Sequence, residues 1–469
     1  MGIGNIFDIA ASGIAAQRLA LEVTGENIAN VNTPGYSRQQ VNMVSKLSIN
    51  TGGVQMGTGV QVNAVLRSYD NMLQQQVVAG NSSYQENLTR QTSLEQIQPS
   101  FNELNADGLG SAVSGFFGAW QDLSVNPQGV AERQALLSKS AIMVDNFHQM
   151  NASLSDVATN ADNDLTGIAA DITASARNLA LVNSQILATQ AVGGNANEIM
   201  DQRDLLVRDL AENAGITWSL QSDGTATVSL VGLGALVSGT QSATVYTEVN
   251  GTKNDVKISA LGAAQDPGDA ALASQATGIG GRLGGTIAVR DFIVPGYLAS
   301  LDSMAQQLVT AVNGQHALGS DLQGNPGGAF FSGTTSADIG LDPGLDSNKV
   351  AASLGGGVGD NTNALAIAAI QSSNLSFTTP SGTTVSTSTE RFYNSLSSTV
   401  GIDVQGAQRS TAQGNAFLKQ MNSLRNSHSG VSLDEELTNL IKYQQAFQGA
   451  SKVINTATNM LDTILNMVR

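Results

Sequence analysis

Both ends of the chain carry apolar side chains at intervals of seven residues, and this spacing constrains the fold more than any other feature of the sequence. A seven-residue repeat with two apolar positions is typical of a helix that packs one face against another helix. We therefore expect an N-terminal helix of about 28 residues, roughly 42 Å long. It should end at Asn32-Thr33-Pro34-Gly35, because Pro34 cannot continue a helix and Pro-Gly suits a type II turn. The first seam position is Phe7, Ile14, Leu21 and Ile28, and the second is Ala10, Gln17, Thr24 and Val31.

The C-terminal segment has the same periodicity. Ser432-Leu433-Asp434-Glu435 is typical of a capping box, and the adjacent acidic residues Asp434, Glu435 and Glu436 complement the dipole of a first helical turn. We expect a helix from about Leu433 to the end of the chain. Its apolar series is Leu440, Phe447, Ile454, Leu461 and Val468, with Leu437, Gln444, Ser451, Thr458 and Leu465 expected at the second seam position.

The polar members of this second position suggest a hypothesis about assembly. Polar seam residues weaken a coiled coil and fix its register. We expect Gln444, Ser451 and Thr458 to limit premature association, so that Gln444→Leu would promote self-association in sedimentation. Pairing of the two terminal helices within one chain and packing against neighbouring chains both satisfy the repeats.

Between the ends the pattern is helical with a β-rich insertion. A third seven-residue repeat, around Leu165, Ile172, Leu179 and Ile186, predicts a long bundle helix closed by Gly193-Gly194. Alternating segments at 225–230, 243–249 and 255–258 predict strands. Further helices are expected at 69–104, 111–123, 130–150, 196–213, 295–316 and 389–427.

These patterns predict a mainly α, α+β fold with a nested organisation. Residues 1–33 and 432–469 would form a terminal coiled-coil domain, and 34–214, 286–318 and 389–431 a helical body. Residues 215–285 would form a β-rich outer insertion. The Gly-, Ser- and Thr-rich stretch 319–388 is expected to be an irregular part of the body or of the outer domain.

Composition excludes several classes of function. Only 13% of the 469 residues are charged, about half the usual 25% or so, and the net charge is −16. We therefore expect no binding to nucleic acid or to an anionic membrane. Cysteine is absent, which excludes disulfides and thiolate sites. The start of the chain lacks the pattern of a cleaved signal peptide, so export would need a dedicated route.

Catalytic patterns are also missing. His148, His316 and His428 are far apart and lie outside any HExxH motif, so each is expected at the surface or at a helix end. The stretch from Asp321 to Asn325 is expected to be a turn and not a calcium loop. The sequence therefore predicts a non-enzyme with no cofactor and no metal site.

Three segments carry a resemblance to a known family. Leu21–Val41, LEVTGENIANVNTPGYSRQQV, resembles the N-terminal signature of flagellar rod, hook and hook-associated proteins, whose core is the string Ala29–Tyr36. The continuation Tyr36-Ser37-Arg38-Gln39 is most similar to the hook-associated members. Gly430–Val468 is similar to the family's C-terminal signature, and Gly280–Phe331 resembles a block that the junction proteins share.

The resemblance implies a structural role at the junction of hook and filament. It implies type III export without a cleaved signal, an extracellular place on the flagellum, and assembly as a ring of identical subunits. The implied partners are the subunit itself, the hook protein, a second junction protein towards the filament, and an export chaperone on the C-terminal helix. The implied assembly residues are Phe7, Ile14, Leu21, Ile28, Asn30, Asn32, Thr33, Pro34, Gly35, Tyr36, Leu437, Leu440, Phe447, Ile454, Leu461 and Val468.

Three alternatives remain open. Another axial subunit, such as a hook or distal rod protein, would share the terminal signatures, but Tyr36–Gln39 and the 280–331 block argue against it. A secreted adhesin would not explain the combination of the signature with a C-terminal seven-residue repeat. A flagellum-associated hydrolase would require paired acids or a metal motif, which the β-rich insertion lacks.

Overall fold

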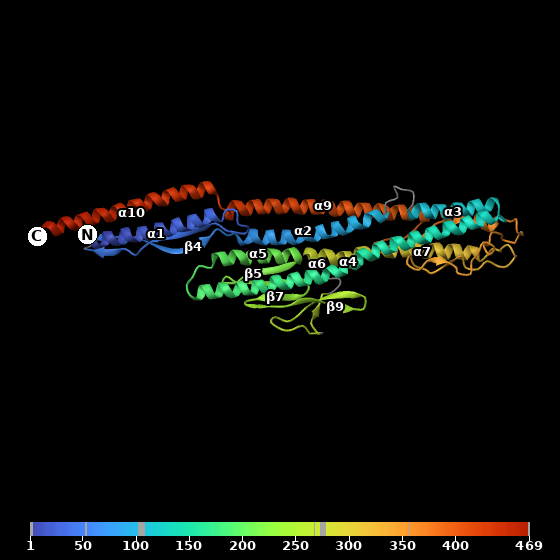
Figure 1. Cartoon of the computed structure of the whole chain (residues 1–469), viewed down its shortest axis with the longest axis horizontal. Helices are drawn as coiled ribbons and strands as arrows, with labels where there is room; N and C mark the ends of the chain where they lie inside the picture. Colours follow the sequence, from blue (N-terminus) through green and yellow to red (C-terminus); the bar gives the residue numbers. More distant parts are fainter. Residues whose placement is uncertain are drawn as a thin grey trace.

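The computed structural model shows an elongated molecule whose long helices run along its length (Figure 1). The structure describes residues 3–51, 54–101, 108–266, 268–272, 278–355 and 357–467. The first and last helices lie beside each other at one end of the molecule, and the body extends from there. The mainly α, α+β class that the sequence predicted is confirmed.

The two ends of the chain form a pair of helices that run in opposite directions. α1 spans Ile3–Ala29 and α10 spans Leu433–Met467, so both predicted terminal helices are confirmed. They pack against each other within one chain, which is one of the two compatible pairings that the repeats predicted. Most of the stability of such helices comes from this kind of packing.

The register of this terminal coil leaves one helix longer than the other. A Cβ atom placed on Gly13 would lie 3.7 Å from Ala450 Cβ, and Asn27 donates a hydrogen bond to Glu436 at 3.1 Å. On this register the first turn of α1 lies opposite Met460. The last turns of α10 therefore extend past the start of α1, and every described residue after Thr458 is exposed.

A long β-hairpin follows α1 and lies along it. The amide of Val60 donates a hydrogen bond to Ser12 Oγ on α1 at 3.3 Å. The sequence analysis missed this hairpin, although polar and apolar residues alternate over 40–43 and 60–63 as in a strand with one face in solvent. In this hairpin β1 pairs with β4 and β2 pairs with β3, in both cases antiparallel. The strands are β1 (Gln39–Ser45), β2 (Ile49–Thr51), β3 (Val54–Met56) and β4 (Val60–Arg67).

Five helices of the body were expected from the sequence and are confirmed. α2 packs along α9 for much of its length. α2 is shorter than predicted: it ends at Ile97 and continues as a 3₁₀ turn, Gln98–Phe101, because Pro99 has no amide proton to donate to the preceding turn. Residues 102–104 of the prediction lie outside the described residues. The helices are α2 (Asn71–Ile97), α3 (Leu109–Val125), α5 (Asn197–Asn213), α7 (Val294–His316) and α9 (Thr389–Ser429).

The helix α4 joins two segments that the sequence analysis treated separately. It runs without a break over Val130–Ala191, 62 residues in all. The prediction of a helix ending near Met150 was therefore wrong, because Leu154 and Val157 continue the buried helical spacing from Met150 to Ala161. Gly193, with a φ of 72°, follows the end of α4 as expected.

The predicted β-rich insertion is present and packs on α4. Thr173 on α4 donates to the carbonyl of Val245 at 2.7 Å, and Asn183 donates to that of Ala226 at 2.9 Å. One sheet has the order β5-β6-β7-β8 and a second has β11-β10-β9. The strands are β5 (Ile216–Leu220), β6 (Ala226–Leu230), β7 (Gly234–Ser238), β8 (Gln241–Ser242), β9 (Val245–Asn250), β10 (Lys253–Ile258) and β11 (Ala270–Ala271).

The end of the body farthest from the termini has an aromatic core. Phe330 lies with its ring centroid 4.8 Å from that of Phe331 and 5.4 Å from that of Trp120, and all three are buried. The stretch 319–388, expected to be irregular, contains short elements that cover this core. They are β12 (Phe331–Ser332), β13 (Gly340–Leu341), α8 (Thr362–Ala369), the 3₁₀ turn Ile370–Ser372, β14 (Leu375–Thr378) and β15 (Thr384–Thr387).

A short helix and one π-helical turn connect the insertion to α7. α6 covers Gly281–Ala288 and the π turn Val289–Ile293. Arg290 in this turn is held by Asp291 and by Asp162 of α4, at 2.7 Å from the latter. This ion pair joins the connection to the middle of α4.

Candidate assembly interface

The segment that leads out of α1 forms a tight turn. The amide of Tyr36 donates to the carbonyl of Thr33 at 3.2 Å, and Gly35 has a φ of 84°, so Pro34 and Gly35 are the central residues, as predicted. A Cβ atom at position 35 would lie 2.7 Å from side-chain atoms of Leu205 in α5. Both the positive φ and this close approach require glycine.

Asn27, in the last turn of α1, is the polar centre of the joint between the terminal coil and the body. Its Nδ2 donates to the carbonyl of Gln39 at 2.9 Å and to Glu436 Oε2 at 3.1 Å. Its Oδ1 accepts from Tyr36 Oη at 2.9 Å and from the Gln39 amide at 3.0 Å. One buried amide thus ties α1, the outgoing segment and α10 together, with good hydrogen-bond geometry.

Arg38 connects the outgoing segment to the start of α10. Its Nε donates to Glu436 Oε1 at 2.7 Å, and its Nη1 donates to Glu435 Oε2 at 2.6 Å. Its amide donates to the carbonyl of Ser429 at 2.8 Å. Glu436 is only 2% exposed, so its charge depends on Arg38 and Asn27 for compensation. The sequence analysis assigned Glu435 to a capping box and did not predict its ion pair with Arg38.

A second set of contacts holds the joint to α5. The amide of Ser37 donates to Asp201 Oδ2 at 2.9 Å. Arg67, at the end of β4, lies 2.7 Å from Asp201 and 2.6 Å from Asp204. Burial raises the pKa of Asp201, and the guanidinium of Arg67 opposes that rise. Because these groups are buried, each depends on its partner.

The predicted assembly residues lie in three settings: exposed on α10, in the loop after α1, or half-buried in the terminal coil. Val468 lies outside the described residues. Two members are exposed on α10: Leu437 at 50% and Leu461 at 39%. In the loop, Asn32, Thr33 and Pro34 are exposed, whereas Asn30, Gly35 and Tyr36 are half-buried. Half-buried in the terminal coil are Phe7, Ile14, Leu21, Ile28, Leu440, Phe447 and Ile454.

The second seam position of α10 differs from the prediction. Gln444 and Thr458 are exposed and Ser451 is half-buried, so the first two do not lie between α1 and α10. That these three residues limit association between chains stays a prediction. The position shifts by one residue, and at Ala450 a small side chain allows the close approach of α10 to Gly13. The residues that face α1 at this position are Glu436, Tyr443, Ala450 and Ala457.

Sequence reasoning missed most of the polar residues of the joint. Arg38 belonged to the signature string, but its partner Glu436 was assigned only to the helix dipole. Asn27, Arg67 and Asp201 were not singled out. One signal was available, since Asn27 lies between the seam positions Thr24 and Ile28, and a polar residue facing a helix partner indicates a specific buried hydrogen bond.

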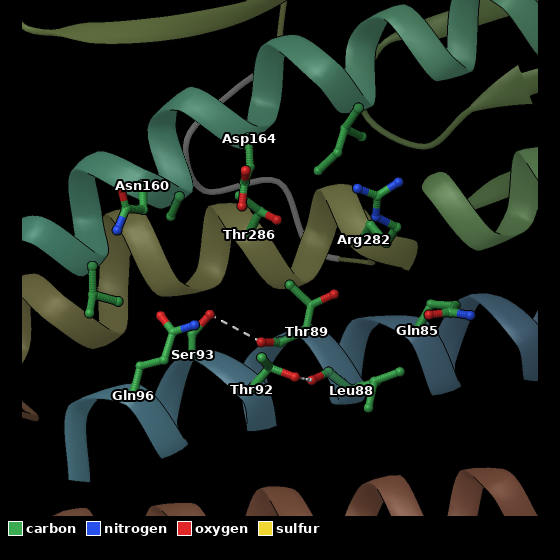
Figure 2. Close-up of a pocket in the computed structure, with 13 residues that line it drawn as sticks. Gln85, Leu88, Thr89, Thr92, Ser93, Gln96, Asn160, Asp164, Arg282 and Thr286 are labelled. Carbon is green, nitrogen blue, oxygen red and sulfur yellow. Dashed lines mark hydrogen bonds between the residues drawn. The ribbon is translucent and has the colours of Figure 1, made fainter. Parts of the chain in front are cut away.

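A groove in the body is of a size that could hold a small ligand. It has a volume of about 360 Å³ and lies between α2, α4 and α6 (Figure 2). On α2, Ser93 and Thr92 donate to carbonyls of their own helix, those of Thr89 and Leu88, at 3.1 and 3.0 Å. Asp164 contributes a carboxylate to the lining of the groove, and Arg282 contributes a guanidinium. The hydroxyl groups of Thr92 and Ser93 are therefore bonded within α2.

The histidines and the predicted turn serve the fold. His316 ends α7 but is fully buried: its Nδ1 lies 2.7 Å from the carbonyl of Gly328, and its Nε2 accepts from the Ala351 amide. Burial lowers the pKa of His316. His148 is exposed on α4, as predicted for a surface residue, and lies 2.7 Å from the carbonyl of Ile339. Within the described ranges, no three His, Asp or Glu side chains gather as a metal site would require.

The turn at Asp321 is confirmed. Its carboxylate accepts hydrogen bonds from the amides of Gln323 and Asn325, both at 2.8 Å, and Gly324 has a φ of 82°. Asp321 thus closes its own loop in the way that turn-forming residues do. Across the part of the chain that the structure describes, no helix combines the length and apolarity needed to cross a membrane.

The two ends of the chain place it in a class of proteins. Residues 7–36, which include most of α1 and the turn, match the model described as flagella basal body rod protein. Residues 425–467, which include α10, match the C-terminal model of flagellar basal body rod FlgEFG proteins. The terminal coil is therefore that of the flagellar axial proteins.

Comparisons of the whole chain give the family. Residues 94–331, just over half of the chain, match the flagellar hook-associated protein FlgK helical domain. The flagellar hook-associated protein 1 of Bacillus subtilis is 30% identical over 98% of this chain and 97% of its own length. The flagellar hook-associated protein 1 of Salmonella typhimurium is 25% identical over 99% of this chain and 100% of its own length. The chain belongs to the flagellar hook-associated protein 1 family, FlgK.

The fold agrees with a solved structure. The flagellar hook junction protein FlgK from Burkholderia pseudomallei superposes with a TM-score of 0.68. It covers 76% of this chain and 100% of its own, at 16% sequence identity. At this identity the likeness concerns the fold alone.

Proposed function

We propose that this chain is the structural subunit that joins the hook of the bacterial flagellum to its filament, as a ring of identical copies. The main support is similarity over nearly the full length to proteins named flagellar hook-associated protein 1. Residues 1–33 and 432–469 serve as the terminal assembly domain of this proposal. The rest of the chain forms the body outside it.

The observation that carries the assembly role is the free end of α10. This end extends past the first turn of α1 and leaves large apolar side chains in water. Apolar area of this kind is stabilised by burial, at about 25 cal/mol per Å², and contiguous patches mark interaction sites. The residues exposed at this end are Met460, Leu461, Ile464, Leu465 and Met467.

The partners follow from this place in the axis. Further copies of the chain complete the ring, the hook protein contacts it on one side, and a second junction protein contacts it towards the filament. An export chaperone covers α10 before assembly, and the chain leaves the cell through the type III route to an extracellular position. The proposed function involves no catalysis and no cofactor, and it requires neither nucleic acid nor a membrane.

The alternatives fit less well. A hook or distal rod subunit would share the models that match the two ends, but the FlgK helical-domain match at 94–331 favours a hook-associated protein. An adhesin would not need the buried joint around Asn27. A hydrolase would need a reactive cluster, and the groove in Figure 2 holds hydroxyl groups that are already bonded.

The experiment is to place charges on the free end of α10. A chain with Leu461→Glu and Ile464→Glu should keep its helical circular dichroism, because both side chains are exposed, but should no longer bind isolated hook ends or hold filaments in electron micrographs. A matched double variant in the body, Leu181→Glu with Val192→Glu, changes side chains that are 63% and 84% exposed and should behave as wild type. Normal junctions with the first variant would exclude this surface.

A further inference from the structure

His316, the last residue of α7, is enclosed at the end of the body farthest from the termini. Its side chain is fully buried, and the centroid of its ring lies 5.4 Å from that of Phe330 and 6.2 Å from that of Trp120. Residues 319–355, which come after α7 and include Phe330, form a segment that we call the cover loop. A Cβ atom on Gly327 would overlap the carbonyl oxygen of His316, so the backbone of the cover loop lies directly against the end of α7.

The two ring nitrogens of His316 have opposite roles in hydrogen bonds to the cover loop. Nδ1 lies 2.7 Å from the carbonyl oxygen of Gly328 and donates to it, because that oxygen can only accept. Nε2 accepts from the amide of Ala351 at 2.9 Å. Only the neutral imidazole has one donor and one acceptor, since both nitrogens of the charged ring carry protons. The closed cover loop therefore fits His316 in its neutral form.

A proton added to His316 inside this enclosure would meet a positive charge. Arg133 of α4 is buried, and its Nη1 donates to the carbonyl of Val350, next to Ala351, at 2.7 Å. Burial lowers the pKa of His316, and the charge of Arg133 lowers it further, whereas the hydrogen bond to Gly328 opposes the shift. The charged ring is thus disfavoured as long as the cover loop is closed.

The other charged side chains on the surrounding elements do not compensate a charge on His316. All four carboxylates of the cover loop accept hydrogen bonds from amides of the same loop. Helix α8 has no charged residue, and the last turns of α7 have none besides His316 itself. The charged residues nearby are Asp122 of α3, Glu132 of α4, and Asp321, Asp338, Asp342, Asp346 and Lys349 of the cover loop.

We propose that His316 is an acid-sensitive lock on the cover loop. A proton on Nε2 would remove the acceptor of the Ala351 amide and place a charge beside Arg133, so the proton binds when the loop opens and the ring reaches water. Opening should then become about tenfold more frequent for each pH unit below about 6.5, where histidine titrates in water. It would expose Trp120 and Phe330. This lock lies at the opposite end from the terminal coil, so it does not depend on the proposed assembly function.

Hydrogen exchange of the full chain, followed by mass spectrometry, measures this opening. Exchange rates between pH 7.5 and pH 5.0 are divided by the intrinsic rate of an unprotected amide at each pH, which leaves the frequency of opening. We expect peptides that contain Ala351 to lose about thirtyfold of their protection between pH 6.5 and pH 5.0. Peptides of α2 should keep theirs, and circular dichroism at both pH values establishes that the helices persist.

Variants assign the response to one side chain. His316→Gln supplies a neutral amide whose oxygen can accept from Ala351, and His316→Asn supplies a neutral donor for Gly328. Each is compared with itself across the pH range, and the protection of both should be independent of pH. His148→Asn, an exposed site beside Ile339 of the cover loop, is the matched control and should respond as wild type does.

Three results would overturn the proposal. The first is wild-type protection at Ala351 that is equal at pH 6.5 and pH 5.0. The second is a pH response that survives in both His316 variants. The third is a response that disappears with His148→Asn, which would assign it to the exposed histidine. The first result needs no variant, so the proposal can be tested even if the His316 variants fold poorly.

Discussion

The two ends of this long molecule are held together in different ways. The far end of the body is a conventional core in which Trp120, Phe330 and Phe331 interlock with almost no exposed area. The terminal coil instead packs small residues such as Gly13 and Ala450 and relies on buried polar groups at its base. Large apolar side chains there point outward on α10.

This difference means that the body is stable by itself, whereas the terminal coil gains stability from a partner. A core of large side chains buries enough area to be stable alone. A coil that buries alanines gains less, and part of its stability comes from hydrogen bonds that contribute only about 1 kcal/mol each. The body is therefore the fixed part of the subunit, and the coil is the part that gains most from packing against other chains.

The largest effect should come from the aromatic core. Trp120→Ala removes a fully buried side chain that touches several rings, so it should lower the free energy of unfolding by about 4 kcal/mol. Chemical denaturation followed by circular dichroism measures this. Val125→Ala, on the same helix but 85% exposed, should change it by less than about 0.5 kcal/mol. Equal losses in the two variants would contradict the contrast between core and surface.

Breaking the buried ion pair should damage the coil alone. Glu436→Ala leaves Arg38 without its buried partner, at a cost of about 3 kcal/mol. Hydrogen exchange should speed up in α1 and α10 but not in α3. Asp434→Ala removes a nearby exposed carboxylate and should cost less than about 1 kcal/mol. The double variant Arg38→Ala with Glu436→Ala should lose less than the sum of the single losses.

The turn after α1 should tolerate no side chain. Gly35→Ala combines a φ of 84° with a contact to Leu205, so we expect a loss of about 2 kcal/mol in the stability of the joint. Gly25→Ala has the opposite sign, because this helical position has open space around it and alanine favours helix by about 1 kcal/mol. Thermal melts compare the stability of the two variants. If Gly35→Ala stabilised the protein, the turn would not require glycine.

The smallest effect concerns pH. The pKa of Glu26 rises from 4.5 in the unfolded chain to about 7 in the folded one, so the folded state binds more protons between these values. Stability should therefore fall as pH rises from about 4.5 to 7 and stay lower above it. Glu26→Gln removes this penalty and should stabilise the joint by about 1 kcal/mol at pH 8, after allowance for solvent screening, but not at pH 4. Melts at both pH values check it.

The helical parts of the fold were predictable because each shows a repeat of apolar residues. The repeats around Phe7, Leu440 and Ile172 gave α1, α10 and the second half of α4. The hairpin of β1 and β4 could have been predicted, since polar and apolar residues alternate over 40–43 and 60–63, as in a strand with one face in solvent. The continuity of α4 was also open to prediction, because Met150, Leu154 and Val157 keep the helical spacing of apolar residues across the polar stretch.

The candidate site was predictable in part. The seven-residue repeats located the surfaces of the coil, and Pro34-Gly35 located its exit. The polar joint could not be found this way, because Asn27 and Glu436 are far apart in the sequence and meet only after the chain has folded. The second seam position of α10 lies one residue from the predicted one, at Glu436, Tyr443, Ala450 and Ala457, which include polar and small residues that hydrophobic periodicity ranks below large apolar ones.

The unbroken helix α4 has a consequence for how this subunit can change in length. Its 62 residues, about 93 Å at 1.5 Å per residue, line the aromatic core at one end and the β-rich insertion at the other. Each inserted residue would rotate one region against the other by about 100°, whereas seven would return it to within about 20°. Insertions and deletions should therefore be confined to loops, or enter α4 only in whole heptads.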